Sequence, residues 1–401
     1  MTSSSLIKSF ILTAATFVLA SCVTAGAQPI SCPATGIWSN PSGTGNIPHE
    51  TAIDHLANRK IVLLGESHDN AAHHRWQLAT ITALHATGNP LVIGFEMFPR
   101  KAQPVLDEWV RGALSEKEFL EKVEWNRVWQ FNPSLYMPIF HFARQHRLPM
   151  VALNVDHSLI REVRKEGWAN VAIEKREGVS DPAAPSAAYA KMLTNIYNQH
   201  ASSKEETSEK TQAISRFIDA QLTWDRAMAE AAAAAAQNSN LVAIIGAGHL
   251  INGYGVPHQL RALGQSDLAV AIPFNEQNDC DEVTPMFADL IFGVDTFERP
   301  AKAHRPLLGV MLDDKEGAVR VGKVLDDSVA KATGIKKDDK ILKAAGLAIK
   351  NNQDLIAVVQ RQAPGTWLPL TIRRGKKVID LVAKFPTLED LKKKAHKSQH
   401  K

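Results

Sequence analysis

Short, uninterrupted apolar runs alternate along most of the chain with segments of helical spacing. Five such runs lie at Ile61–Leu64, Leu91–Phe95, Met150–Leu153, Leu241–Ile245 and Leu268–Ile272. Helical spacing of apolar residues marks 75–87 and 137–146, and a longer segment at 211–237. Runs that are apolar throughout are typical of strands covered on both faces, and strands that alternate with helices pair in parallel. We therefore expect an α/β domain with a mostly parallel sheet flanked by helices.

The pattern changes near residue 300, where the segment TFERPAKAHRP at 296–306 has the composition of a linker. After it, short strands alternate with turns, and one helix is indicated at 353–362; this size suits an independent β-rich module. A segment rich in charge, Ala, Pro and Ser indicates a variable helical insertion. The expected organisation is an N-terminal segment at 1–27, an α/β domain at 28–298 with its insertion at 170–205, a small module at 303–386 and a basic tail at 387–401.

The N-terminal segment has the features of a secretory signal. Lys8 precedes an apolar stretch at 10–20, which is too short for a permanent membrane anchor. Leu-Ala-Ser-Cys, ending at Cys22, resembles a bacterial lipobox and predicts a lipidated Cys22; Ala25-Gly26-Ala27 offers an ordinary cleavage site instead. Either site predicts export to the periplasm. Val23 after the cysteine resembles the outer-membrane sorting signal of enterobacterial lipoproteins and favours the outer membrane.

Cysteine usage agrees with export. The chain has three cysteines, and if Cys22 is lipidated or removed, Cys32 and Cys280 remain. Two cysteines in an oxidising compartment can form a disulfide, which would tie the N-terminal segment to the end of the main domain. The alternative is a pair of unbonded, buried thiols. Two cysteines alone cannot form a structural zinc site, which needs four protein ligands.

Composition and charge exclude several classes of protein. Apolar residues make up 45% of the chain and charged residues 22%, which excludes a wholly disordered or polytopic membrane protein. Lys and Arg number 46 against 42 Asp and Glu, a net charge of +4, and part of the excess lies in the last ten residues. A surface built to neutralise many phosphates needs more clustered positive charge. We therefore expect no nucleic-acid partner.

Polar and titratable residues directly follow four of the predicted strands. In an open parallel sheet, ligands bind beyond the carboxyl ends of the strands. Two of these segments share the pattern Gly-x-x-His, at 65–68 and 246–249; the glycine lets the chain turn sharply and the histidine point into the crevice. Asn154 and His157 follow a third strand. The sequence therefore predicts a functional crevice lined by Glu66, His68, Glu96 and His249.

These four residues are compatible both with an enzyme and with a binding protein. Histidine and carboxylate could share a divalent metal, or a histidine could act as a general base, in a hydrolase. The familiar catalytic motifs are not present: Ile251 replaces the third glycine of a dinucleotide fingerprint, and Ser67 lacks the flanking glycine of a nucleophile elbow. The sequence also contains neither a phosphate loop nor His-Glu-x-x-His. Nucleotide, zincin and serine-hydrolase functions are thereby disfavoured.

Residues 123–142 are unusually aromatic and include Tyr136, which Pro133 and Pro138 keep near a loop or a helix start. An aromatic wall with a phenol suits a flat apolar ligand, and a phenolate can bind the iron of ferric haem. The alternative is that these rings only cover a face of the sheet.

Five segments in order resemble the ChaN family of haem-binding lipoproteins, in the wider Tiki/TraB/erythromycin-esterase-like group: LLGESHDNAAHHRWQL, GFEMFPRKAQPVLDEW, NPSLYMPIFHFARQHRLPMVALN, QLTWDRAMAEA and IIGAGHLINGYGVPHQL. The resemblance covers roughly residues 50–275. It implies an α/β domain that binds haem at the outer membrane in iron uptake. A dimer can enclose paired haems in that family, so a homodimer is a further expectation. Related branches of the group are hydrolases, which keeps catalysis as the alternative.

The resemblance also implies a tyrosine on the haem iron and basic residues near the propionates. Tyr136 and Tyr254 are the tyrosines in matched segments, and Tyr136 is the preferred iron ligand. His68 and His249 are further candidates for contact with the cofactor. Arg100 is a candidate for the propionates by its charge.

The C-terminal module resembles a bacterial PDZ domain. Leu307-Leu308-Gly309-Val310 matches the loop whose backbone N–H groups receive a peptide carboxylate, and 328–342 matches a characteristic turn. The resemblance implies a peptide groove that uses Leu308, Gly309 and Val310, between 309–313 and the helix at 352–360. The alternative is a module that acts only as a spacer or a dimer contact.

Overall fold

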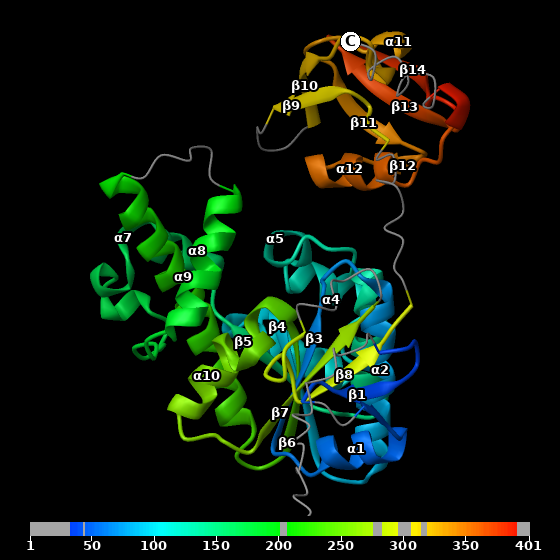
Figure 1. Ribbon diagram of the computed structural model, residues 1–401. Coiled ribbons are helices and arrows are strands. Elements are labelled where there is room, and N and C mark those ends of the chain that lie inside the picture. Colours follow the sequence, from blue (N-terminus) through cyan, green and yellow to red (C-terminus); the bar gives the residue numbers. More distant parts are fainter. Residues whose placement is uncertain are drawn as a thin grey trace, which may run out of the picture. The chain divides into compact units, whose positions relative to one another are not determined.

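The computed structural model describes residues 33–42, 45–200, 207–275, 283–295, 306–313 and 319–390 (Figure 1). It divides the chain into two compact units, Met1–Phe297 and Glu298–Lys401. The division falls within the segment whose composition indicates a linker. Cys22, Cys32 and Cys280 lie outside the described residues, so lipidation and the disulfide stay predictions.

The first unit is built on an eight-stranded sheet with the order β2-β1-β8-β7-β3-β6-β4-β5. Five of its neighbouring pairs are parallel, and only β1 pairs antiparallel, with β2 and with β8. The expected mostly parallel α/β sheet is therefore confirmed. The strands are β1 Trp38–Asn40, β2 Gly45–Ile47, β3 Ile61–Glu66, β4 Leu91–Pro99, β5 Met150–Asn154, β6 Asn240–Gly246, β7 Leu268–Phe274 and β8 Leu290–Gly293.

Helices cover both faces of this sheet (Figure 1). On β3, Val62 and Leu64 join a core formed with the helices that precede β5, whereas Ile61 and Leu63 join a second core formed with α9 and α10. This two-sided burial explains why the strands are apolar at every position. The α-helices are α1 His49–Ala57, α2 Ala71–Ala86, α3 Gln103–Val110, α4 Glu116–Lys122, α5 Trp125–Val128, α6 Met137–Gln145, α7 His157–Glu166, α8 Ala187–His200, α9 Ser208–Ala235 and α10 Gly255–Ala262.

All five predicted strands form, and each runs further than its apolar core. The largest extension is in β4, which continues to Pro99, so that Glu96 lies inside the strand rather than after it. The short strands β1, β2 and β8 have too few residues for a periodic signal. Within the expected insertion, the short 3-10 turn Ile173–Lys175 precedes the helix α8.

The second unit is a small antiparallel β structure with its own core. Its main sheet has the order β14-β13-β11-β10-β9, with β12 paired to β11. An ion pair between the buried Asp339 and the half-buried Arg374 joins the turn before β11 to the end of β13. The small β-rich domain that the sequence predicted is thereby confirmed. The elements are β9 Val310–Asp313, β10 Val319–Val324, α11 Val329–Thr333, β11 Lys340–Ala344, β12 Leu347–Ala348, α12 Asn352–Gln360, β13 Trp367–Arg374 and β14 Lys377–Lys384.

Candidate functional site

Glu66, the last residue of β3, is the centre of a buried polar cluster. Its side chain is only 1% exposed, and Oε1 accepts hydrogen bonds from the Tyr136 hydroxyl (2.9 Å) and from Nδ1 of His68 (2.7 Å). Burial raises the pKa of this carboxyl, but the interactions with His68 and His74 outweigh it and lower the pKa to about 2. Glu66 is therefore an ionised carboxylate enclosed by donors.

The turn that follows β3 is fixed by the start of α2. Asn70 caps the helix and accepts hydrogen bonds from the backbone N–H groups of Ala72 and His73. Nδ1 of His73 accepts from the Ser67 N–H at 2.9 Å, and burial lowers the pKa of His73 to about 4. His73 is therefore neutral, and it holds the backbone beside the cluster rather than joining it.

His74 supplies a second imidazole partner of Glu66. Nδ1 lies 3.1 Å from Oε1 of Gln77, whose amide group donates to the backbone of β3, so Nδ1 must be the donor in this contact. Nε2 donates to the carbonyl of His68 at 3.2 Å. With both nitrogens facing acceptors, and with Oε2 of Glu66 at 3.1 Å from Nδ1, the pKa of His74 is raised despite its burial. The contact with Oε2 is ionic, because its geometry is not that of a hydrogen bond.

Glu96 and His68 meet at Gly246, the last residue of β6. Oε2 of Glu96 accepts from the Gly246 N–H at 2.5 Å. A Cβ at this glycine would lie 2.8 Å from Cε1 of His68 and 3.4 Å from Oε2 of Glu96. Because β6 lies between β3 and β4, the residues at the ends of these neighbouring strands meet in the space that a side chain at Gly246 would occupy. Only glycine leaves room for both.

His249 continues the cluster on the other side of Glu96. It ends the 3-10 turn Ala247–His249, and its Nδ1 lies 2.6 Å from Oδ1 of Asp225, a fully buried residue of α9. Nε2 lies 3.7 Å from Oε1 of Glu96, and Tyr189 donates to Oδ2 of Asp225 at 2.8 Å. Burial lowers the pKa of His249, but Asp225 and Glu96 together raise it to about 9. His249 is therefore cationic at neutral pH.

His68 is the cluster member that opens most toward solvent. Its side chain is 30% exposed, and its ring lies against Trp129 (4.6 Å between centroids) and Phe131 (5.1 Å). Nδ1 is fixed by Glu66, while Nε2 has no hydrogen-bond partner within the part of the chain that the structure describes. An imidazole held at one nitrogen by a carboxylate and open at the other is typical of a metal-ligating histidine.

Tyr136, the preferred iron ligand from the sequence, is fully buried between β3 and α6. Its hydroxyl donates to Glu66 and also lies 3.2 Å from the carbonyl of His68. Burial and the neighbouring Glu66 carboxylate raise the pKa of the phenol, which opposes the phenolate that ferric haem binds. In this structure Tyr136 serves as a donor to Glu66, and its oxygen is closed to a ligand.

Tyr254, the second candidate, is half-buried at the start of α10. Its ring lies 5.4 Å from that of Tyr189. At the next residue, Gly255 (φ +51°), a Cβ would be 2.4 Å from the carbonyl oxygen of His249 and 3.0 Å from Oδ1 of Asp225. This close approach places the backbone at Gly255, the residue after Tyr254, against the His249–Asp225 pair.

Three other residues from the sequence analysis have different partners. The Arg100 guanidinium donates to the carbonyl of Ala227 at 2.9 Å and pairs with Glu230 at 3.3 Å, which ties β4 to α9. Asn154 donates to the backbone carbonyl of Glu96 at 3.1 Å and so supports the cluster indirectly. His157 bonds to the carbonyl of Val128 at 2.8 Å.

Sequence reasoning missed the residues that fix His249, which are Asp225 and its partner Tyr189. Asp225 lies in the middle of α9, far from any strand end, and nothing in its local pattern marks it as polar and buried. The same holds for Tyr189, which lies in the expected variable insertion. Asp225 does fall in the segment QLTWDRAMAEA, so the resemblance was the only available signal for it.

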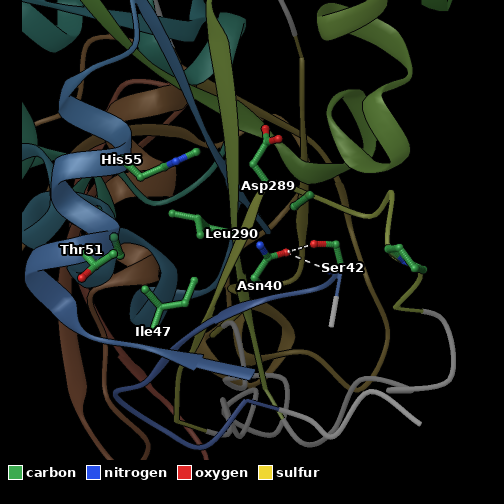
Figure 2. Close-up of a pocket in the computed structure, with 10 residues that line it drawn as sticks. Asn40, Ser42, Ile47, Thr51, His55, Asp289 and Leu290 are labelled. Carbon is green, nitrogen blue, oxygen red and sulfur yellow. Dashed lines mark hydrogen bonds between the residues drawn. The ribbon is translucent and has the colours of Figure 1, made fainter. Parts of the chain in front are cut away.

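The described residues contain a separate hollow of about 250 Å³ beside α1, β1 and β8. Figure 2 shows Asn40 and Ser42 joined by hydrogen bonds at this hollow, with His55 and Asp289 also on its lining. None of the predicted site residues lines it. The hollow is therefore distinct from the cluster at the strand ends.

The described residues contain neither a metal-ligating cluster nor a membrane-spanning helix. No group of three or more His, Cys, Asp or Glu side chains in these ranges is placed to hold a metal ion. Among the helices in the same ranges, none combines the length and the hydropathy that crossing a bilayer requires.

The predicted peptide loop lies beside β9, the edge strand of the second sheet. The carbonyl of Leu308 accepts from Ala330 N–H and that of Gly309 from Leu325 N–H. Gly309 has φ +81°, and a Cβ there would be 2.2 Å from Cβ of Ser328, so this turn requires glycine. Val310 begins β9, which pairs only with β10 among the described strands.

Comparisons with known proteins identify both domains of the chain. The family model described as haem-binding uptake, Tiki superfamily, ChaN matches residues 52–260, and a PDZ domain model matches residues 306–384. No curated protein matches the chain.

Among solved structures, "Cofacial heme binding to ChaN of Campylobacter jejuni" is 18% identical, with a TM-score of 0.52, and the match covers 64% of this chain and 95% of that chain. The HtrA3 PDZ domain bound to a phage-derived ligand is 19% identical (TM-score 0.18; 20% of this chain, 83% of that chain). A serine endoprotease from Yersinia pestis is 23% identical (TM-score 0.20; 22% and 32%). Because the first family model spans more than half of the sequence, the chain belongs to the ChaN family of haem-binding uptake proteins in the Tiki superfamily, and it carries a PDZ domain after the family domain.

Proposed function

We propose that the chain binds haem at the carboxyl ends of β3, β4 and β6 and takes part in haem or iron uptake. The observation that carries this proposal is His68, whose Nδ1 is fixed by Glu66 while Nε2 stays open beside Trp129 and Phe131. Membership of the ChaN family supports haem as the ligand.

The residues of the cluster fit the chemistry of a haem. The iron of a bound haem is a Lewis acid that accepts nitrogen or phenolate oxygen ligands, and its propionates are anions. The rings of Trp129 and Phe131 offer apolar faces next to the imidazole of His68. His249, cationic because of Asp225 and Glu96, can attract a propionate.

Tyr254 is the better candidate for a tyrosine ligand to the iron. It is half-buried and directly precedes Gly255, whose backbone packs against His249, whereas the Tyr136 oxygen is closed and bonded to Glu66. Using Tyr136 would break its hydrogen bond and leave Glu66 with one donor fewer, at a cost of about 1–3 kcal/mol.

A hemin titration of the four Tyr→Phe variants tests this assignment. Wild-type protein should give a saturable shift of the Soret band, and Tyr254→Phe should weaken binding by about 10- to 100-fold and change the spectrum, since a coordinating group is lost. Tyr197→Phe is the matched control, because Tyr197 lies on α8 against Phe217. A spectral change seen only in Tyr136→Phe would identify Tyr136 as the iron ligand. If the wild-type protein gave no Soret shift, the haem proposal would be contradicted.

Hydrolysis is the second candidate function, favoured by one observation. Asp225, His249 and Glu96 form a line of carboxylate, imidazole and carboxylate, as in sites of acid–base catalysis. The raised pKa of His249 makes it a proton donor rather than a base at neutral pH. Metal analysis of protein prepared without chelator, together with His249→Ala, separates the two functions: a stoichiometric divalent metal that this variant loses would favour the enzyme.

Export completes the proposed role. The apolar stretch at 10–20 and the lipobox ending at Cys22 support an outer-membrane lipoprotein, facing the periplasm or the surface, and the small-residue site at 25–27 would give a periplasmic protein instead. Incorporation of labelled palmitate that Cys22→Ser abolishes would establish the lipid anchor. We also propose a homodimer around paired haems, for which a haem-dependent change in mass by light scattering is the test.

The PDZ domain is proposed to dock the C-terminus of a partner protein along β9. The free edge of β9 can add a strand, and the glycine turn at Gly309 presents backbone N–H groups beside it. Binding of C-terminal peptides from a display library, lost in Gly309→Val but kept in Gly346→Val, would support this role; equal binding by both variants would contradict it.

A further inference from the structure

The two units of the chain carry opposite net charges. Residues 298–401 contain 23 Lys and Arg against 12 Asp and Glu, a net charge of +11, while residues 1–297 contain 23 against 30, a net charge of −7. The overall value of +4 hides this contrast. Within the described residues of the second unit, 14 basic residues stand against nine acidic ones. The second unit is therefore the part of the molecule that an anionic surface would attract.

One face of the β13–β14 hairpin is open to solvent. The two strands pair in an unbroken register from Trp367↔Lys384 to Arg374↔Lys377. Residues alternate along β13 between the buried side, with Leu368, Leu370 and Ile372, and the outer side. We call the outer side the hairpin face; it consists of Trp367, Pro369, Thr371, Arg373, Val378, Asp380, Val382 and Lys384.

Large apolar side chains on this face are exposed rather than packed. Trp367 is 64% exposed, Val378 60% and Val382 47%. Exposing a tryptophan and two valines to water on one face costs free energy. A partner surface that covered these side chains would remove that cost. These residues contribute nothing to the core of the domain, which lies on the other side of the sheet.

Cations surround these apolar side chains. Nζ of Lys384 lies 4.3 Å from the centre of the Trp367 ring, and Arg373, Lys376 and Lys377 are exposed at the turn between the strands. The one carboxylate on the face, Asp380, accepts a hydrogen bond from Thr371 at 2.8 Å. Tryptophan together with lysine and arginine is the combination that lies in the headgroup layer of anionic membranes.

Protection of an edge strand explains only part of this pattern. Lysine on a free edge such as β14 discourages pairing with another chain. That role does not require an exposed tryptophan on the neighbouring strand, nor valines beside the lysines. The hairpin face also lies away from β9, because β14 and β9 are at opposite ends of the sheet order.

We propose that the hairpin face binds an anionic phospholipid surface, with Trp367 in the headgroup layer and Arg373 and Lys384 paired with lipid phosphates. This contact is independent of haem binding and leaves the edge of β9 free for a peptide. It would hold the PDZ domain at the membrane whether or not Cys22 carries lipid.

Vesicle co-sedimentation tests the proposal, with the chain starting at Gln28 so that neither the signal nor a lipid contributes. Wild type should bind vesicles of phosphatidylglycerol and phosphatidylcholine, and should bind pure phosphatidylcholine vesicles far more weakly. Arg373→Glu/Lys384→Glu should lower the partition coefficient roughly 30-fold or more, since each basic residue contributes about 1 kcal/mol at an anionic surface. Trp367→Ala should weaken binding about tenfold and leave its salt dependence in place.

The matched control is Lys337→Glu/Lys350→Glu, which changes the same charge at exposed positions outside the hairpin. It should retain most of the binding, and circular dichroism should show every variant folded. Equal losses in the two double variants would mean general charge attraction without a defined face and would overturn the proposal. Failure of wild type to bind anionic vesicles would overturn it as well.

Discussion

Replacing Glu66 by Ala should lower the free energy of unfolding of the first unit by about 3–5 kcal/mol, since the change removes one partner of a buried ionic cluster. The substitution leaves the Tyr136 hydroxyl and the imidazole rings of His68 and His74 without the acceptor that compensates their burial. Urea unfolding followed by tryptophan fluorescence measures the change. Glu121→Ala is the control, because that carboxylate is 65% exposed, and it should cost less than about 0.5 kcal/mol.

The same carboxylate should make stability depend on acid. The pKa of Glu66 falls from 4.5 to about 2 on folding, so its contribution is fully present above pH 4.5 and is lost as the pH falls toward 2. Glu66→Gln should flatten the stability profile of wild type in that window. Identical acid profiles for the two proteins would show that Glu66 is not held ionised by its neighbours.

Replacing Asp225 by Asn should lower the free energy of unfolding by about 3 kcal/mol. It should also remove the dependence of stability on pH at the alkaline end. His249 has its pKa raised to about 9, so its contribution to stability is fully present below the unfolded value of 6.5 and is lost as the pH rises through 9. With an amide at position 225 the pKa of His249 should fall, which NMR titration of its ring can follow.

Tyr189→Phe serves as the comparison for Asp225. It removes the other hydrogen bond to Asp225 and leaves the ion pair with His249 intact. We expect a loss of about 1 kcal/mol with the alkaline pH dependence unchanged. A pKa of His249 that is the same in Asp225→Asn and in wild type would contradict the assigned role of Asp225.

The position of the site was predictable because it follows from topology. Buried parallel strands are apolar on both faces, so Glu66, Glu96 and His249 are conspicuous where they interrupt or follow such runs. The carboxyl ends of parallel strands lie at the same edge of a sheet. Because the strand order is β3-β6-β4, these residues are neighbours at that edge. Gly65 and Gly246 helped to mark these positions, but the expectation that they form sharp turns was wrong: both lie within their strands, where a Cβ would collide with Ile272 and His68, respectively.

The roles within the site were not predictable from pattern alone. Tyr136 looked accessible because Pro133 and Pro138 flank it, yet its hydroxyl turns inward to satisfy the buried Glu66. Asp225 and Glu66 lie 159 positions apart in the sequence, and each is paired through contacts that only the folded chain creates. Hydrogen bonds to buried carboxylates depend on side-chain rotamers, which leave no periodic trace in a sequence.

The most direct test of the haem site is a hemin titration of His68→Ala beside His141→Ala. His141 pairs with Glu116 on the surface, away from the cluster, and so controls for loss of an imidazole. We predict that His68→Ala weakens hemin binding by at least about tenfold and alters the Soret band, while His141→Ala leaves both unchanged. Hemin binding by His68→Ala with the affinity and spectrum of wild type would contradict a haem site at the carboxyl ends of β3, β4 and β6.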